Sequence, residues 1–355
     1  MIRLTDTEST LIQELLGCVS EAIERTEGIS PQYANKTKLQ KLLYFAIEEY
    51  DLPITYSWYL AGAVVPDTDI TPESLASPQS PQTPPSPSTH ALDGSVDGLE
   101  GRDGEQSGID PIMFSDSVDT PTDTPESIFE LVDRSTLIDF YVSKLPSVWS
   151  QNTMRFLQNF YQEAAPSEYR SLYIESTHLR THLNELAEAV ESHTRGEVPT
   201  TPIDELEIRL GRTVSDFHYY LRDIKELRET FELVVKGTDL IEDAVATLAS
   251  LPPSEYTSEH VRTLEALQDF FYYYVWRYPC LRISSKTATG PSAAALANKH
   301  RRSFEQFPER FRTAHQEAVE TVRAAGLYPD PLAPDESGDD DVARTLTDLS
   351  VEYFE

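Results

Sequence analysis

The sequence is poor in cysteine and has no long apolar run. Its two cysteines, Cys18 and Cys280, lie far apart in the chain and form no pair with the spacing of metal ligands. So few cysteines indicate a reduced, cytoplasmic protein, because disulfides belong to oxidising compartments. No stretch of about 18 apolar residues predicts a membrane-spanning helix. Residues 2–17 carry acidic side chains where a signal peptide has a basic start.

Positive charge is also scarce. The 355 residues include 29 Lys and Arg against 60 Asp and Glu, which gives a formal net charge of −31, and only 8 of the basic residues are lysines. A charge of this size bears on solubility and partners rather than on fold. A carboxylate-rich, lysine-poor composition is typical of proteins that stay soluble in concentrated salt, so we expect a halophilic source. An acidic mimic of nucleic acid is the alternative. Non-specific binding to nucleic acid or to an anionic membrane is disfavoured.

Motifs of common enzymatic chemistry are missing. The chain has no Gly-x-Ser-x-Gly elbow, no Walker loop and no Gly-x-Gly-x-x-Gly fingerprint. His178 and His182, with Glu175 and Glu185 at matching spacing, place four candidate zinc ligands along one helical stripe. The zinc-protease pattern is absent, however, because no glutamate follows the first histidine. We interpret the stripe as a solvated charged face and predict a protein that is not an enzyme and needs neither metal nor cofactor.

The apolar residues that are present recur at helical spacing, so we predict an all-α fold. Residues 6–27 form an opening helix, for which Thr7 is the expected cap. In residues 169–191, leucines seven apart predict a seam along one face, and residues 203–235 carry a second seam with the same period. The loop between them contains Gly196, Pro199 and Pro202, so the two helices should form an antiparallel hairpin. The members of the two seams are Leu172, Leu179, Leu186, Ile203, Leu210, Phe217, Ile224 and Phe231.

Composition divides the chain into four regions. Residues 1–65 form a small N-terminal helical module, and residues 127–327 form a larger helical bundle. Between them, residues 66–126 hold 10 of the 24 prolines and 13 acidic residues against one arginine. Such a segment cannot bury enough apolar surface to fold, so we predict a disordered acidic insertion. Residues 328–355 form an acidic tail.

Residues 36–65 are the compact, apolar centre of the N-terminal module. A helix over 37–50 ends before Pro53. Residues 55–65, with several aromatics around Gly62, suit either a short hairpin or a second small helix. The pattern alone is that of an amphipathic helix followed by an aromatic plug that serves packing.

The amino-acid sequence of this segment resembles that of a known family. Residues 39–46 are LQKLLYFA, and they are followed by Trp58 and by GAVV at 62–65. This resembles the opening of the Panacea (SocA-like) antitoxin domain, in which a proline stands at the position of Ala63. The resemblance covers about thirty residues of the chain. It implies a mostly helical domain that binds and neutralises a toxin, or passes one to a protease, without catalysis.

Five polar and aromatic residues of this segment are the candidate partner-binding site. Lys38 and Lys41 lie three apart on the helix, and we expect both at the surface, because two lysines are seldom buried together. The full set is Lys38, Gln40, Lys41, Tyr44 and Trp58.

A second candidate site lies in the most basic part of the chain. Residues 277–312 hold eight basic residues and only two acids, directly after the aromatic run 270–276. Basic and aromatic residues together are typical of nucleic-acid grooves. Internal pairing with carboxylates and binding of an acidic protein are the alternatives. The candidate residues are Arg277, Arg282, Lys286, Lys299, Arg301 and Arg302.

From these observations we expect a protein-binding regulator, with antitoxin-like neutralisation of a toxin as its activity. One alternative is a nucleic-acid-associated regulator that uses the basic segment 277–312. The other is a structural scaffold in which the two apolar seams pair between chains as a coiled coil. The sequence leaves the identity of the partner and the oligomeric state open.

Overall fold

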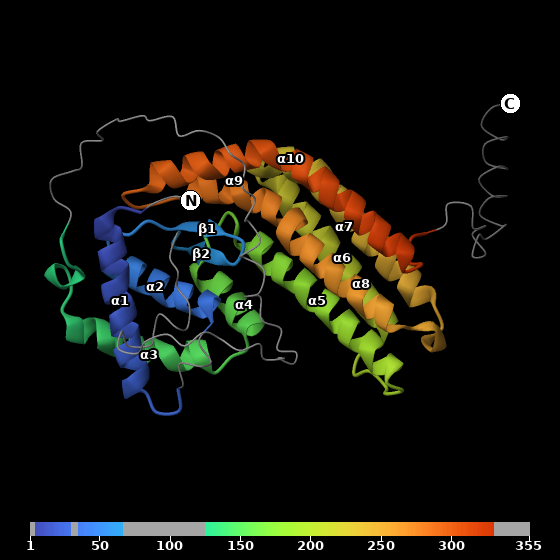
Figure 1. The fold of residues 1–355 in the computed structure, drawn as a ribbon, viewed down its shortest axis with the longest axis horizontal. Coiled ribbons are helices and arrows are strands. Elements are labelled where there is room, and N and C mark those ends of the chain that lie inside the picture. Colours follow the sequence, from blue (N-terminus) through green and yellow to red (C-terminus); the bar gives the residue numbers. More distant parts are fainter. Residues whose placement is uncertain (1–3, 30–34, 67–124, 330–355) are drawn as a thin grey trace, which may run out of the picture.

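A computed structural model describes residues 4–29, 35–66 and 125–329. The insertion predicted at 66–126 and the tail predicted at 328–355 fall almost wholly outside these residues. The described chain is helical apart from one two-stranded hairpin, which confirms the all-α prediction. Figure 1 shows a compact end that contains α1 to α4 and the hairpin, and an elongated bundle that extends from it.

The compact end is built around the hairpin. Helices α1 (Asp6–Arg25) and α2 (Lys36–Tyr50) precede strands β1 (Ser57–Tyr59) and β2 (Gly62–Val64), which pair antiparallel with Trp58 opposite Ala63. The sequence left hairpin and helix open for this segment, and the structure has the hairpin. Helix α1 begins two residues earlier than it would with Thr7 as its cap. Thr5 is the cap, in a reciprocal capping box with Glu8.

Two helices predicted for the bundle pack against the compact end instead. After a short 3₁₀ turn (Ile128–Glu130), α3 (Arg134–Trp149) contacts α1 and α2. Helix α4 (Thr153–Ala164) follows and presents Phe160 to the hairpin, where it stacks on Trp58. Pro146 lies inside α3, and the helix continues through it to Trp149.

The bundle contains the predicted helical hairpin. Helices α5 (Arg170–Thr194) and α6 (Ile203–Asp223) pack along their lengths, and α7 (Phe231–Ser250) and α8 (Ser258–Phe270) complete the core beside α10 (Ala293–Ala324). The predicted helix 203–235 is broken at Ile224, whose extended ψ of 108° leads into a 3₁₀ segment, Lys225–Thr230. A second 3₁₀ turn, Pro253–Glu255, joins α7 to α8. Seven of the eight seam residues are buried within this single chain, so the two seams are not available for pairing between chains.

Helix α8 continues without a loop into α9. Residues Phe271–Trp276 form a π-helical segment, and α9 (Arg277–Thr287) follows directly, so the chain is helical from Ser258 to Thr287. Pro279 has no N–H to give to a helical bond, which requires a local change in the hydrogen-bond pattern. The wider π turn just before it is such a change.

Helix α10 spans both parts of the molecule (Figure 1). Its 32 residues run past Pro308, which lies inside the helix. Phe304, Phe307 and Phe311 are buried on either side of the proline and hold both halves against α8 and α9. Within the part of the chain that the structure describes, no helix is both long and apolar enough to cross a membrane.

Candidate interaction surface

The lysines of the Panacea-like segment are buried, so their predicted place at the surface is wrong. Lys41 is 0% exposed, and its Nζ donates a hydrogen bond of 2.8 Å to the carbonyl of Ala63 in β2. Lys38 is 6% exposed, and its Nζ donates to the carbonyl of Gln151 at 3.0 Å. Buried carbonyls need donors. A long side chain that carries three N–H groups can meet that need across a gap between elements.

Gln40 fixes the end of the hairpin in the same way. Its side-chain amide donates to the carbonyl of Val65 at 3.2 Å, and its side-chain oxygen accepts from the backbone N–H of Val65 at 2.8 Å. This pair of bonds mimics one more step of a β-ladder. Lys38, Gln40 and Lys41 therefore hold the hairpin and the loop between α3 and α4 onto α2.

Tyr44 and Trp58 belong to an aromatic core. The two rings meet edge to face at 5.7 Å between centroids, and Trp58 stacks on Phe160 at 5.4 Å. Burial raises the pKa of Tyr44 well above its ordinary value. All five predicted partner-binding residues are thus interior, and the packing interpretation of the segment describes their positions.

The hairpin is held on its other side by α9, which places the compact end firmly on the bundle. Ser57 Oγ lies 2.6 Å from Ser284 Oγ, and the backbone N–H of Trp58 donates to Thr287 Oγ1 at 3.0 Å. The indole N–H of Trp276 donates to the carbonyl of Leu60 at 2.9 Å. The hairpin therefore lies between α2 and α9, and its backbone groups are bonded by both.

Glu8 is a buried carboxylate at this junction that the sequence analysis did not single out. It accepts hydrogen bonds from the backbone N–H of Thr55 at 2.9 Å, the hydroxyl of Ser292 at 2.6 Å, and Thr5. Burial by itself would raise the pKa of Glu8, but these hydrogen bonds outweigh it and the pKa is lowered. The Thr-x-x-Glu spacing of residues 5 and 8 was the available signal.

A serine and histidine contact lies beside the hairpin. His300 Nδ1 is hydrogen-bonded to Ser284 Oγ, and the imidazole stacks on Tyr59 at 5.0 Å between ring centroids. Burial, together with the nearby charges of Lys299 and Arg277, lowers the pKa of His300 to about 4. His300 is therefore neutral at pH 7. Ser284 is fully buried and Ser57 nearly so, which leaves no approach for a substrate, and the contact serves the junction.

The six predicted basic residues divide into two groups. Arg277 donates from Nε to the hydroxyl of Tyr59 at 2.8 Å, at the junction. Arg282 lies over the ring of Phe304 at 5.5 Å and pairs with Glu229 at 3.4 Å. These two arginines therefore make contacts within the chain, as in the alternative of internal pairing.

The other four basic residues are exposed. Lys286 lies in the last turn of α9, and Lys299, Arg301 and Arg302 lie in the first half of α10. Because Ser284 meets His300 across the antiparallel pair, all four lie at one end of it. No described carboxylate lies within 4.0 Å of their nitrogens, and residues 279–304 contain no Asp or Glu. We call these four residues the basic face.

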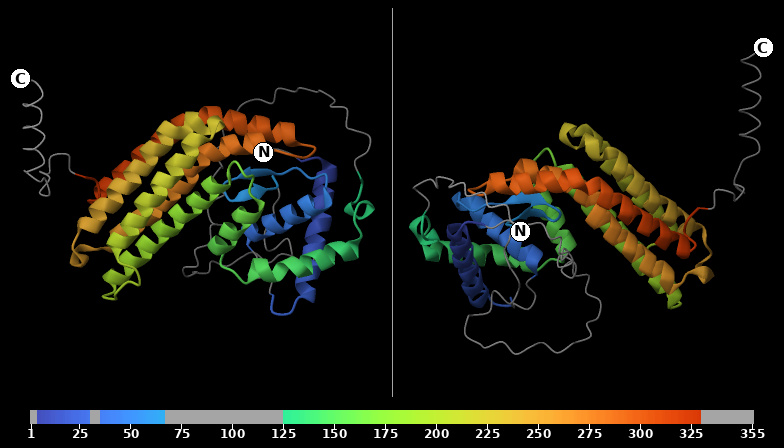
Figure 2. Two further views of the ribbon diagram at one scale, coloured as in Figure 1. Left: turned by 180° about the vertical axis from the view of Figure 1, so that it is seen from behind. Right: turned by 45° about the horizontal axis from the view of Figure 1, so that its top comes forward.

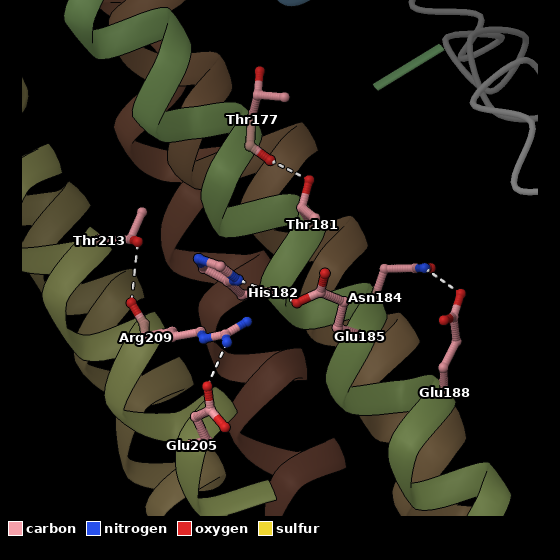
Figure 3. Close-up of polar contacts among 9 residues, drawn as sticks. All are labelled: Thr177, Thr181, His182, Asn184, Glu185, Glu188, Glu205, Arg209 and Thr213. Atoms are coloured by element: carbon pink, nitrogen blue, oxygen red, sulfur yellow. Dashed lines mark hydrogen bonds and ion pairs between the residues drawn. The ribbon is translucent and has the colours of Figure 1, made fainter. Parts of the chain in front are cut away.

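The histidine stripe on α5 does not gather ligands. Each histidine pairs with a glutamate of its own helix, His178 with Glu175 at 3.1 Å and His182 with Glu185 at 3.4 Å. Figure 3 shows His182 and Glu185 on α5 beside the separate ion pair of Arg209 and Glu205 on α6. Within residues 4–29, 35–66 and 125–329, no three or more His, Cys, Asp and Glu side chains are arranged to hold a metal ion.

The fold defines a class of protein: an all-α chain in which a compact end, built around a small β-hairpin, is joined to a helical bundle. The model of one family, Domain of unknown function (DUF8098), matches residues 1–355, and the chain belongs to this family. No curated protein and no solved structure shows significant similarity to it.

Proposed function

We propose that this protein is a protein-binding regulator whose partner docks on the basic face. The observation that carries the proposal is the exposure of Lys286, Lys299, Arg301 and Arg302 in a chain of net charge −31. Exposed cations that form no ion pair with a described carboxylate attract an acidic partner and speed its association. The Panacea resemblance supports a toxin as the partner. The acidic composition supports action in a salt-rich cytoplasm.

Binding of nucleic acid is the second candidate, and one feature of the structure disfavours it. Single-stranded nucleic acid needs exposed aromatic rings on which bases stack. In the run 270–276, Phe270, Phe271, Tyr272 and Trp276 are buried, and Tyr273 and Tyr274 are half-buried. The basic face therefore lacks the stacking platform that the sequence suggested, and we favour a protein partner.

The proposal is tested by affinity capture with the full chain from a lysate of the source cells. We expect the wild type to retain one protein in near-stoichiometric amount, and the double variant Arg301→Glu, Arg302→Glu to lose it. The matched control is Arg212→Glu, Arg222→Glu, which makes the same change on the exposed side of α6. Capture that is equal in all three proteins would contradict the proposal. Retention of nuclease-sensitive material instead of a protein would favour the second candidate.

A further inference from the structure

A groove runs between α8 and the second half of α10, helices that lie side by side in Figures 1 and 2. Its volume is about 520 Å³, within the range of pockets that bind ligands. Alanines at 266, 314 and 318 line it together with the aromatic rings of Phe270, Tyr273 and Tyr274. Small residues on both walls let the backbone of a third helix come close, and the rings offer it apolar area.

The spacing of the lining residues is that of a helix-packing seam. One wall contributes positions 266, 269, 270, 273, 274 and 277, and α10 contributes 314, 317, 318 and 321. Steps of three and four residues keep each set on one face of its helix. Two such faces side by side present the holes into which the side chains of a third helix fit.

Charge is ordered along both walls of the groove. On α10 the flank that carries Glu317 continues towards the helix start through Arg310 to Lys299, by steps that keep these positions on one side. On the opposite wall Arg277 lies towards the same basic end and Asp269 lies beside the Glu317 end. Lys299, one member of the basic face, therefore lies in line with one end of the groove, and Asp269 and Glu317 lie at the other.

We propose that this groove takes an amphipathic helix of the partner, acidic at one end, apolar along its middle face, and basic at the other end. The inference rests on the proposed function, because it names the part of the partner that docks. Lys299 and Thr321 are 22 residues apart on α10, or about 33 Å at 1.5 Å per residue, and the groove itself is lined by residues 314–321 of this stretch. The bound helix would have about six turns and would dock as helices do in preformed grooves.

The probe is a synthetic 22-residue amphipathic peptide with an acidic block, a leucine stripe and a basic block. Its twin carries glutamine in place of both charged blocks. We expect the full chain to bind the charged peptide, and to bind the twin about tenfold more weakly, which is the effect of about 1.4 kcal/mol. Isothermal titration calorimetry measures both affinities. The proposal is overturned if the charged peptide does not bind at about 1 mM, a concentration that corresponds to a binding free energy of only about 4 kcal/mol. It is also overturned if the twin binds with the same affinity as the charged peptide.

Two variants locate the binding. Ala318→Trp fills the groove, and its control, Ala246→Trp, places the same ring on the exposed side of α7. Glu317→Lys reverses the acidic end at an exposed position and leaves the core intact. We expect Ala318→Trp and Glu317→Lys each to weaken the charged peptide about tenfold, and Ala246→Trp to bind as wild type. Wild-type affinity in both groove variants overturns the proposal.

Repeating the lysate capture with Ala318→Trp separates this inference from the proposed function. If this variant keeps the partner that Arg301→Glu, Arg302→Glu loses, the partner docks on the basic face as proposed. The proposal that a helix of the partner binds the groove is then overturned. If both variants lose the partner, both proposals stand. A synthetic peptide of residues 330–355 that binds in an Ala318-dependent way would make the chain itself the occupant. If the protein forms a dimer that the Ala318→Trp variant loses, the occupant of the groove is a second copy of the chain. Either result overturns an external partner helix.

Discussion

Two groups of cationic side chains in this protein differ in burial: one is interior and the other is exposed to solvent. Lys38 and Lys41 on α2 are buried and donate to backbone carbonyls. Lys299 and Arg302 on α10 are exposed, and no described carboxylate lies within 4.0 Å of their nitrogens. Both pairs lie three residues apart on a helix, and both were predicted to be surface sites. The comparison shows that two basic residues three apart on a helix need not be exposed. They can be buried where a neighbouring strand or loop has backbone carbonyls that require hydrogen-bond donors.

The largest expected effect is the loss of a buried donor. Lys41→Met keeps the apolar stem but leaves the Ala63 carbonyl without its bond from Nζ, and an unsatisfied buried polar group costs about 1–3 kcal/mol. We expect the free energy of unfolding to fall by about 2–3 kcal/mol, measured by urea denaturation. The matched variant Lys299→Met removes an exposed lysine and should change it by less than about 0.5 kcal/mol. Equal losses in the two variants would remove the distinction between the groups.

A medium effect is expected at Glu8, the buried anion of the junction. Its pKa in the folded state lies below the ordinary value of 4.5, so its stabilising contribution is full at neutral pH. That contribution is lost as the pH falls below 4.5 through the folded-state pKa. Glu8→Gln should lower the free energy of unfolding by about 1–2 kcal/mol at pH 7.

The pH dependence is the sharper part of the Glu8 measurement. The difference between wild type and Glu8→Gln should shrink steadily in acid, because the protonated glutamic acid loses the same charge-assisted bonds. Urea denaturation at pH 7, 5 and 3.5 follows it. Glu24→Gln, on the exposed side of α1, is the control and should show no such trend. A difference that stays constant with pH would mean that the charge of Glu8 contributes nothing.

The smallest expected effect links the basic face to the junction. Lys299 and Arg277 both help to lower the pKa of His300 to about 4, after the larger effect of burial. Lys299→Met removes one repelling charge, so the pKa of His300 should rise modestly and remain below the ordinary 6.5. Titration of the His300 ring signals by NMR measures it. Arg302→Met is the comparison, and an equal rise there would show that the effect is general to the face.

Local sequence patterns predicted the helices well because their cause is local. The apolar spacing of α1, α2 and α5 follows from which face each helix buries, and their observed bounds lie within a few residues of the expected ones. The errors fall where context alters a local rule. A proline usually ends or kinks a helix, yet packing on both sides carries α3 and α10 through Pro146 and Pro308. Ile224 lies in a regular heptad, but the chain turns there.

The candidate site was predicted only in part. The sequence located the basic segment 277–312, because an excess of one charge is visible in composition. It could not separate Arg277 and Arg282, which bond to Tyr59 and Glu229, from the four exposed members of the basic face. Nor could it find the Ser284 and His300 contact, because those residues meet only when α9 and α10 pack antiparallel.

The sequence by itself determined that this protein is helical, strongly acidic, and locally basic near its last helix. Each of these properties follows from residue types and their spacing along the chain. The tertiary structure decided which charges face solvent and where the hairpin lies. Lys41 is buried because Ala63 and Phe160, 22 and 119 residues away, enclose it. Burial is a property of neighbours in space, and the neighbours of α2 come from distant parts of the chain.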